Sequence, residues 1–381
     1  MANLLQLHAS AGLYGGESVI LALSNALRHR GVTPIVGCVA VRDRGTPELG
    51  VKAAEHGHWV EYFPTTRSLA LSPVRAIRRL VRELDIAVIH AHGYKSNLLG
   101  GLAALGTGVP VVTTNHLYPM MPLDDRKLQL YGQVDVKLTS RLLDRIVAVS
   151  EGIRDRLVRQ GVPEAKVTVI ENGIDIAEFA TDGVADRKAL RESLGIPEDA
   201  VVVGSLARLT PQKGQQYLLE AARRLAGRGV PFRLVVAGDG PLREGLAAQA
   251  AGLGVADRVT FLGFRRDTRA LLAMMDVFVL SSIEEGLPMA MLEAMASRVP
   301  VVTTSVGDIP KVIRHLRNGI LVPPRDSAGL ADALHLVITD PEVRTALAAE
   351  AHRTVVSAYS QEAMCEKYLA VYHALRPGVL A

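Results

Sequence analysis

The chain has 381 residues, of which 49% are hydrophobic and 4% aromatic, and its formal net charge at pH 7 is +4. This hydrophobic content excludes an intrinsically disordered chain. The length exceeds the ~250–300 residues at which a single hydrophobic core stops growing, so we expect two domains. Basic and acidic residues are spread evenly over both halves, which argues against a nucleic-acid-binding arm in either half.

Two cysteines, Cys38 and Cys365, stand far apart and outside any spacing that is typical of metal ligands. We expect both to be free thiols in a reducing compartment, and we expect no zinc site. The first apolar stretch is too short for the core of a signal peptide, and no later run is long enough to span a membrane. These features predict a cytoplasmic protein.

The first half of the chain alternates short apolar runs of β type with helical stretches, a pattern typical of a parallel sheet covered by helices on both faces. The expected helices include Glu17–Arg30, Pro73–Leu84 and Ser96–Leu105. The expected strands are Leu4–His8, Pro34–Ala40, Trp59–Phe63, Ile86–His90, Val109–Thr114, Arg145–Ser150 and Lys166–Ile170.

The second half repeats this alternation and ends in a helical tail from Ala328 to Leu375. Its expected strands are Val201–Leu206, Arg233–Ala237, Arg258–Leu262, Val277–Leu280, Val299–Thr303 and Gly319–Val322. The polar, glycine-containing stretch Glu171–Pro197 is expected to connect the halves. The whole pattern predicts an α/β fold of two doubly wound, Rossmann-like domains, residues 1–185 and 186–358, with a C-terminal helix at 359–381.

The stretch from Asp276 to Ala296 reads as a buried strand, a loop and a helix whose first residue is Pro288. Free N–H groups at such a helix start favour an anion, and phosphate is the obvious candidate. Glu285 and Glu293 can border the same cavity, where a carboxylate accepts hydrogen bonds from sugar or ribose hydroxyls. The alternative is one acidic residue that balances the helix dipole and one on the surface.

A second cluster of polar residues follows the strand expected at Val201–Leu206. Arg208 and Lys213 lie in a loop that also contains Pro211 and Gly214. An arginine fork and a lysine point charge at this spacing suit a diphosphate. Surface charge is the ordinary alternative for both residues.

The first loop of the chain contains Gly15 and Gly16, followed by Glu17. Glycines between a first strand and its helix let the backbone approach a ligand closely, although a simple tight turn is equally consistent with them. The sequence lacks the Gly-x-Gly-x-x-Gly of dinucleotide-binding folds, which disfavours a nicotinamide oxidoreductase.

Two histidine segments follow expected strands, one containing His92 and the other Asn115 and His116. Neither has the carboxylate or cysteine company that a metal site requires. We favour a site role for His116 over a satisfied loop histidine. For His92 the satisfied loop histidine is favoured instead, and an acceptor-side position for His92 and Asn115 is the alternative.

Taken together, these motifs resemble those of the retaining nucleotide-sugar glycosyltransferases called family 4. The spacing Glu285-x7-Glu293 is similar to the family signature, and Gly-x-x-x-Arg208-Leu-x-x-x-Lys213-Gly is similar to its phosphate-binding segment. Gly15-Gly16-x-Glu-type loops lie against the donor diphosphate in the family, and Asn115-His116 is similar to its Thr-x-His. Smaller matches at residues 171–175, 237–241 and 261–264 extend the resemblance from residue 12 to about residue 325.

The resemblance implies the GT-B architecture, two facing Rossmann-like domains with a cleft between them and a last helix that crosses back to the N-terminal domain. It implies that Glu293 accepts from ribose, that Glu285 accepts from the sugar, and that His116 reaches the transferred sugar. It further implies that Arg208 and Lys213 neutralise the diphosphate. The remaining residues that it places at the donor are Gly286, Leu287, Pro288 and Phe264.

The sequence therefore predicts an enzyme, a retaining glycosyltransferase that moves a sugar from a nucleotide-diphosphate sugar to a hydroxyl of a glycan, a lipid-linked or a small-molecule acceptor. The alternatives are a GT-B-like sugar phosphorylase or epimerase, and a non-catalytic nucleotide-sugar-binding protein. No Asp-x-Asp occurs, so we expect a metal-independent reaction without a cofactor.

Two features bear on specificity and location. Family members often carry Gly-Gly-x-x-Glu where this chain has Gly307-Asp308-Ile-Pro-Lys311, which puts donor preference in doubt.

The helix expected at Pro73–Leu84 carries four arginines on one stripe, at 75, 78, 79 and 82. The stripe suits a peripheral contact with anionic lipid at the inner face of the cell membrane, but a solvated helix face is the more common outcome.

Overall fold

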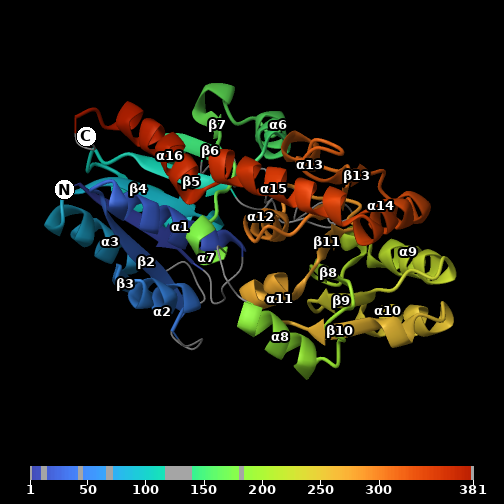
Figure 1. The fold of residues 1–381 in the computed structure, drawn as a ribbon. Coiled ribbons are helices and arrows are strands. Elements are labelled where there is room, and N and C mark those ends of the chain that lie inside the picture. Colours follow the sequence, from blue (N-terminus) through green and yellow to red (C-terminus); the bar gives the residue numbers. More distant parts are fainter. Residues whose placement is uncertain are drawn as a thin grey trace. The chain divides into compact units, whose positions relative to one another are not determined.

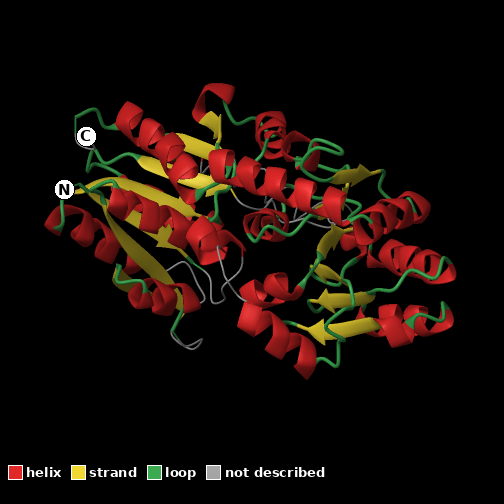
Figure 2. Ribbon diagram, viewed as in Figure 1, coloured by secondary structure: helices red, strands yellow, loops and turns green. Residues whose placement is uncertain are grey.

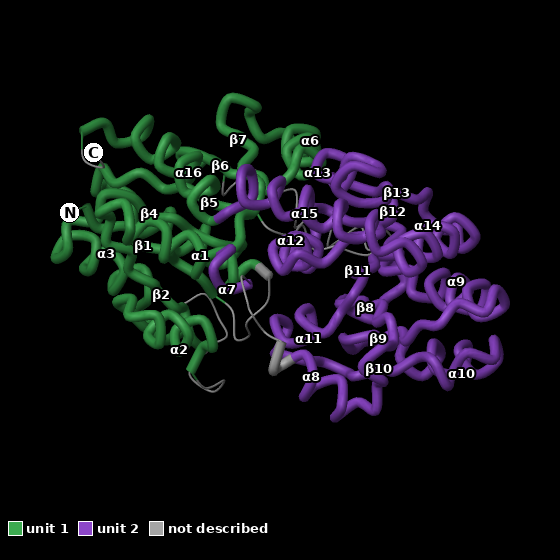
Figure 3. Tube along the Cα trace, viewed as in Figure 1, with its two compact units in different colours: residues 1–174, 361–381 green, residues 175–360 purple. Residues whose placement is uncertain are grey.

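The computed structural model describes residues 2–9, 15–41, 46–65, 72–115, 140–179 and 184–378. The chain forms two compact units, and Figure 3 shows them in separate colours. Unit 1 contains residues 1–174 and 361–381, and unit 2 contains residues 175–360. In each unit, helices flank a sheet whose described strands are all parallel (Figure 2).

Within the described residues, the sheet of unit 1 has seven strands in the order β3-β2-β1-β4-β5-β6-β7 (Figure 1). The strands are β1 (Asn3–His8), β2 (Thr33–Val41), β3 (Trp59–Thr65), β4 (Ile86–His92), β5 (Val111–Asn115), β6 (Arg145–Ala148) and β7 (Val167–Val169). The helices are α1 (Gly15–His29), α2 (Glu48–Glu55), α3 (Ser72–Glu83), α4 (Tyr94–Ala104), α6 (Glu151–Arg159) and α16 (Gln361–Leu375), and a 3-10 turn spans Glu164–Lys166.

Successive residues of a strand serve opposite faces of this sheet, as the pleat requires. Ile35 packs with Leu5 and Ile89 on one face, whereas its neighbour Val36 packs with Ile20 of α1 on the other. Every residue of β4 is buried, so its sequence lacks the regular polar alternation of a strand with one exposed face. It is a mostly apolar run that also contains His90 and His92.

Within the described residues, the sheet of unit 2 has six strands in the order β10-β9-β8-β11-β12-β13. The strands are β8 (Val202–Leu206), β9 (Arg233–Ala237), β10 (Val259–Gly263), β11 (Val277–Leu280), β12 (Val301–Thr304) and β13 (Ile320–Val322). The helices are α7 (Ile176–Phe179), α8 (Val184–Ser193), α9 (Gln215–Gly227), α10 (Arg243–Gly252), α11 (Thr268–Met274), α12 (Met289–Ala296), α13 (Ile309–Val312), α14 (Ser327–Thr339) and α15 (Pro341–Ala358), with 3-10 turns at Pro211–Lys213 and Ala256–Arg258.

Both sheets reverse their strand order once, between β1 and β4 in unit 1 and between β8 and β11 in unit 2. This is the order of the doubly wound fold, so the predicted fold class is confirmed. One predicted boundary within it is wrong. Pro288 has an extended backbone, with φ −74° and ψ 121°, and is the N-cap of α12 rather than its first helical residue. Its carbonyl already accepts from the Met291 N–H at 3.1 Å, so helical hydrogen bonding begins there.

The basic stripe expected on α3 is interrupted by Arg78. Its Nε donates to the Ala103 carbonyl at 3.1 Å, and its Nη2 donates to the carbonyls of Leu102 and Leu105 at 2.8 and 3.1 Å. These carbonyls end α4 and have no partners within that helix, so Arg78 caps it. The arginines at 75, 79 and 82 are exposed, which leaves a narrower basic face than the sequence predicts.

The stretch that was expected to connect the two domains, Glu171–Pro197, forms α7 and α8, and both helices belong to unit 2. Two arginines of α8 bind Asp276, the residue just before β11. Arg187 Nη2 and Arg191 Nη2 lie 2.6 and 2.7 Å from the two carboxylate oxygens of Asp276, and the Val202 N–H donates to Oδ2 at 2.7 Å. Burial alone would raise the pKa of Asp276, but these donors outweigh it and lower that pKa. The cluster joins α8, β8 and β11.

We expect Asp276→Asn to lower the free energy of unfolding of unit 2 by about 3 kcal/mol at pH 7, because the buried Arg191 would lose its counter-charge. Urea unfolding measures this loss. The pKa of Asp276 is lowered in the folded protein, so its contribution to folding stability is complete above the ordinary pKa of a carboxyl group. That contribution disappears as the pH falls below this value. Asp332→Asn, which breaks an exposed pair with Arg228, is the control and should cost less than about 1 kcal/mol. Equal losses in both variants would contradict this assignment.

Candidate active site

The candidate site of unit 2 is built from the loops that follow β8, β9, β11 and β12, all of which leave the sheet at its carboxyl edge. Backbone hydrogen bonds join these loops directly. The Leu209 N–H donates to the Asp239 carbonyl at 3.0 Å, and the Ile283 N–H donates to the Gln212 carbonyl at 2.7 Å. The Asp308 N–H donates to the Gly286 carbonyl at 3.2 Å. The four loops therefore form one connected surface.

Glycine is required at two of the points where these loops meet. Gly214 has φ +61°, and a Cβ there would lie 2.2 Å from the carbonyl oxygen of Ser281. Gly307 has φ +57°, and a Cβ there would lie 2.0 Å from the carbonyl oxygen of Glu285. A side chain at either position would push the loop after β11 away from its neighbours.

The structure brings Lys213 and Glu285 together, although the sequence places them far apart. Lys213 Nζ lies 2.6 Å from Glu285 Oε1, and Ser282 Oγ donates to the same oxygen at 2.7 Å. The Glu285 side chain is 7% exposed and that of Lys213 is 25% exposed. Among the described residues, Glu285 Oε2 has no hydrogen-bond partner, so it remains able to accept from a ligand hydroxyl.

Arg208 lies in the same loop as Lys213 but behaves differently. Gln215, which is buried, donates from Nε2 to the Arg208 carbonyl at 2.9 Å and so fixes the backbone at this residue. The Arg208 side chain is exposed, and within the described parts of the chain it makes no ion pair and no hydrogen bond. The loop therefore presents one paired and one unpaired cation.

The N-terminus of α12 adds backbone donors next to Glu285. No side chain caps it. The N–H groups of Met289 and Ala290 lie in the first turn and have no intrahelical acceptor, so they favour a bound anion. Gly286 is exposed, and Leu287 is buried beneath the turn.

Glu293 lies in the second turn of α12 and is partly buried. Burial raises the pKa of Glu293 to about 7, and the nearby carboxylate of Glu178 in α7 adds to the rise. Near neutral pH this carboxyl group therefore exists in both protonation states. Hydroxyl donors from a ligand would favour the ionised state.

Phe264 follows β10 at the same carboxyl edge of the sheet. The Gly238 N–H donates to the Gly263 carbonyl at 2.8 Å, which holds this loop beside the end of β9. The Phe264 side chain is 63% exposed. An exposed aromatic ring at a strand end offers an apolar face to a planar ligand.

In unit 1, the loop glycines stand at the start of α1, which begins with Gly15 and Gly16. Glu17 in its first turn is buried and lies 2.9 Å from His8 Nε2. His8 Nδ1 lies 2.8 Å from the His92 carbonyl, which can only accept, so Nδ1 carries a proton. These contacts hold His8, Glu17 and the end of β4 together at the start of α1.

His92 itself is 1% exposed, and its Nε2 lies 2.6 Å from Gln6 Oε1. This burial favours the structural role over the acceptor-side role that was left open for His92. Asn115 ends β5 and is partly buried. His116 lies outside the described residues.

A buried polar network in unit 1 was not predicted from the sequence. His90 lies 2.7 Å from Thr114 Oγ1 through Nε2 and 2.7 Å from the Tyr372 hydroxyl through Nδ1. The Tyr368 hydroxyl lies 2.8 Å from Thr114 Oγ1, so two tyrosines of α16 join the sheet. In the sequence, Tyr368 and Tyr372 are one helical turn apart, which places them on the same face of the last helix. This spacing could have indicated that the face contacts another part of the protein.

Comparisons with known proteins agree with these motifs. Residues 186–354 match the family described as Glycosyl transferases group 1, and residues 14–178 match Glycosyltransferase Family 4. The lipopolysaccharide core biosynthesis glycosyltransferase LpsE of Rhizobium meliloti is 36% identical over 245 residues, which cover 64% of this chain and 68% of LpsE. The chain belongs to the family 4 glycosyltransferases.

Further similarities support this assignment. A GDP-mannose-dependent α-(1-6)-phosphatidylinositol monomannoside mannosyltransferase of Mycolicibacterium smegmatis is 31% identical to this glycosyltransferase over 319 residues, 80% of this chain and 81% of that one. The crystal structure of Anabaena HepE in complex with UDP aligns with a TM-score of 0.80 and 24% identity, covering 98% of this chain and 100% of HepE. HepE thus shares the fold, and the enzyme class follows from the family.

Within the described part of this glycosyltransferase, no helix has both the length and the apolar composition that crossing a membrane requires. Among the same residues, no three His, Cys, Asp or Glu side chains gather in a group that would hold a metal ion. Cys38 and Cys365 are both free and buried, and burial raises the pKa of each thiol to about 12.

We expect Glu293→Gln to make this glycosyltransferase more stable than the wild type at pH 8 but not at pH 5. The pKa of the Glu293 carboxyl group is raised to about 7 in the folded protein. Its contribution to folding stability is therefore complete below the ordinary carboxyl pKa and is lost as the pH rises through 7. The difference should grow with pH to at most about 3 kcal/mol. Thermal unfolding from pH 5 to pH 8 measures it, with Glu284→Gln, an exposed residue of the loop before α12, as the control. A pH-independent difference would contradict the raised pKa.

Proposed function

We propose that this enzyme is a retaining glycosyltransferase that uses a nucleoside-diphosphate sugar as donor and a hydroxyl group as acceptor. The observation that carries the proposal is the pairing of Lys213 with Glu285 beside Arg208 and the uncapped start of α12. Positive charge, free backbone amides and a carboxylate oxygen without a partner are thus available on one connected set of loops. A phosphate group and a polyhydroxylated sugar together require this combination.

The reaction breaks the bond between the anomeric carbon of the sugar and an oxygen of the diphosphate, and the electron pair leaves with the diphosphate. A new bond forms from the acceptor oxygen to the same carbon, and the proton of the acceptor hydroxyl passes to an oxygen of the leaving diphosphate. Negative charge grows on the leaving diphosphate, so fixed cations and amides that already point to it lower the barrier. We assign this role to Arg208, Lys213 and the first turn of α12.

The two carboxylates take different parts in the proposal. Glu285 is held by Lys213 and Ser282 through Oε1, which leaves Oε2 for a hydroxyl of the transferred sugar. Glu293 accepts hydrogen bonds from ribose hydroxyls in its ionised form. Donor binding should therefore release a proton from Glu293 at pH values below about 7.

We further propose that the reaction is independent of divalent metal. The sequence has no Asp-x-Asp pair to hold an ion on the diphosphate, and Arg208 and Lys213 supply positive charge instead. We expect the initial rate to be unchanged when EDTA is added to purified enzyme, because the charge on the diphosphate is then neutralised by side chains and backbone amides alone. Loss of activity that Mg²⁺ restores would refute this point.

The donor base and the acceptor are open within this proposal. The named relatives include an enzyme dependent on GDP-mannose, and the structure of HepE contains UDP, so the base differs among similar proteins. The same mannosyltransferase acts on a phosphatidylinositol monomannoside, and LpsE acts in lipopolysaccharide core biosynthesis. We propose a carbohydrate or lipid-linked acceptor, a cytoplasmic location, and a peripheral membrane contact through the exposed arginines of α3.

The test of the function begins with thermal unfolding in the presence of UDP-, GDP-, ADP- and TDP-sugars, because a ligand of the folded state raises Tm. The donor that stabilises the protein is then incubated with carbohydrate and lipid-linked acceptors, and the anomeric configuration of the product is measured by NMR. An α-linked product from an α-linked donor is expected. An inverted product would overturn the retaining mechanism, and phosphate-dependent cleavage without an acceptor would indicate a phosphorylase.

We expect Arg208→Ala to lower kcat by about 10²–10³-fold, the scale for removing one preorganised donor to a developing negative charge. Lys213→Ala should lose at least as much, because it also leaves Glu285 without its cation. Steady-state kinetics at saturating donor measure both losses. Arg224→Ala, which removes an exposed arginine of α9 in the same unit, is the control and should retain wild-type kcat. Wild-type turnover in Arg208→Ala would contradict the proposed role.

A further inference from the structure

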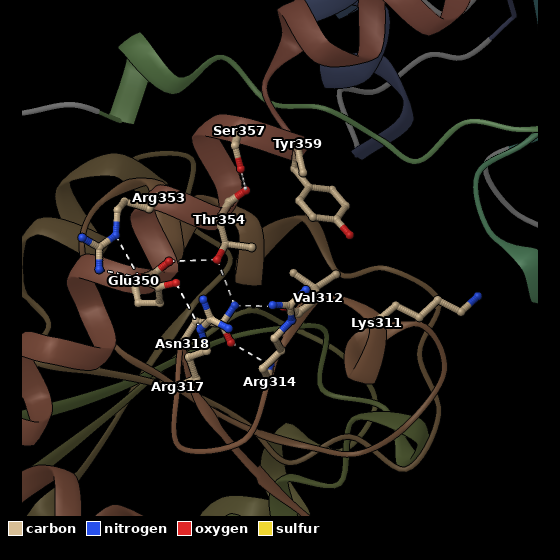
Figure 4. Close-up of a pocket in the computed structure, with 11 residues that line it drawn as sticks. Lys311, Val312, Arg314, Arg317, Asn318, Glu350, Arg353, Thr354, Ser357 and Tyr359 are labelled. Carbon is tan, nitrogen blue, oxygen red and sulfur yellow. Dashed lines mark hydrogen bonds and ion pairs between the residues drawn. The ribbon is translucent and has the colours of Figure 1, made fainter.

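A second polar pocket lies within unit 2, between α13 with the turn that follows it and the C-terminal part of α15 (Figure 4). Its volume is about 340 Å³. Among its lining residues, Lys311, Arg314, Arg317 and Arg353 carry positive charge and Glu350 carries negative charge. Lys311 directly follows the loop after β12 and pairs with Asp308 of that loop, whereas the other four residues lie outside the loops of the candidate active site.

The floor of this pocket is rigid. Asn318 is 2% exposed, and its Oδ1 accepts from the Arg314 backbone N–H at 2.6 Å. Its Nδ2 donates to the Val312 carbonyl at 2.9 Å and to Thr354 Oγ1 at 3.0 Å. One buried amide therefore fixes the turn after α13 against α15, and it fixes the backbone that carries Arg314.

Glu350 orients two of the arginines. Arg353 Nε donates to Glu350 Oε2 at 2.9 Å, and Arg317 Nε lies 3.3 Å from Glu350 Oε1 (Figure 4). The hydrogen bond from Arg353 is the main cause that lowers the pKa of Glu350, so the carboxylate stays ionised at neutral pH. A guanidinium group has five N–H donors, so each arginine keeps donors for a second anion.

The other two cations add charge that Glu350 does not balance. Lys311 Nζ lies 2.8 Å from Asp308 Oδ1. The Arg314 side chain is exposed and makes no ion pair or hydrogen bond to any residue that the structure describes. Counting Asp308 with the pocket, two carboxylates face four cations, which leaves a surplus of positive charge.

We propose that this pocket binds a phosphoryl group. Arginine forks held in place by a carboxylate match the geometry of phosphate oxygens, and the charge surplus favours a dianion. The group can come from a soluble phosphorylated molecule or from the headgroup of a membrane phospholipid. One observation favours the phospholipid headgroup. Leu316 lies in the turn between Arg314 and Arg317 with its side chain 58% exposed, so it could insert into the membrane interface beside the headgroup.

The soluble source is tested by thermal unfolding with inorganic phosphate against chloride at matched ionic strength. Arg208→Ala/Lys213→Ala protein serves as the background, because both side-chain cations of the candidate active site are then absent and its phosphate binding is weakened. We expect phosphate to raise Tm in this background. Adding Arg314→Gln and Arg353→Gln should weaken the apparent phosphate affinity by roughly tenfold or more, as expected for two lost charge-assisted hydrogen bonds. Adding Arg224→Gln instead removes a remote arginine and should change nothing.

The lipid source is tested by co-sedimentation with phosphatidylcholine vesicles that do or do not contain phosphatidylglycerol. Binding that requires phosphatidylglycerol and is lost in Arg314→Gln/Arg353→Gln assigns the pocket to a lipid headgroup. Leu316→Ser should then reduce vesicle binding while leaving any phosphate-induced rise of Tm intact. Equal behaviour of the pocket variant and the Arg224→Gln control in both experiments would overturn the proposal.

Discussion

The parallel pairing of strands is the constraint on which the arrangement of this enzyme depends. Because neighbouring strands run in the same direction, the loop that leaves each one emerges at the same edge of the sheet. In unit 2 this places the residues after β8 beside those after β11, although 72 positions separate Lys213 from Glu285. The ion pair between them is therefore a direct consequence of the sheet order, and the glycines at 214 and 307 permit the last close approach.

Sequence reasoning identified the elements of the fold and the polar residues at the strand ends for the same physical reason. Strands buried on both faces are rich in apolar residues, so the polar residues in the loops that follow them, such as Arg208 and Glu285, stand out. Contacts between distant loops were not accessible in this way. The sequence presents Lys213 as a ligand for phosphate, whereas the structure shows that it also fixes one oxygen of Glu285.

Burial was the other quantity that the sequence did not supply. His92 follows an expected strand just as Glu285 does, yet β4 is central and extends through that residue, so its ring is enclosed and bonded to Gln6. The raised pKa of Glu293 likewise comes from enclosure and from Glu178, which lies in a short helix that the sequence pattern did not indicate. Arg78 does not belong to the exposed basic stripe expected on α3, because its guanidinium group donates hydrogen bonds to the carbonyls at the end of α4.

The tyrosines of α16 have a consequence for the order in which the protein folds during synthesis. His90 and Thr114 are buried polar groups of the first unit, and Tyr368 and Tyr372 supply hydrogen bonds to them from near the end of the chain. All of residues 175–360 are translated between these partners, which takes roughly 10–40 s at ordinary rates of elongation. The second unit is contiguous and can fold on the ribosome as it emerges. The first unit begins earlier but is completed after the second, so its sheet lacks the hydrogen bonds from Tyr368 and Tyr372 until α16 has been synthesised.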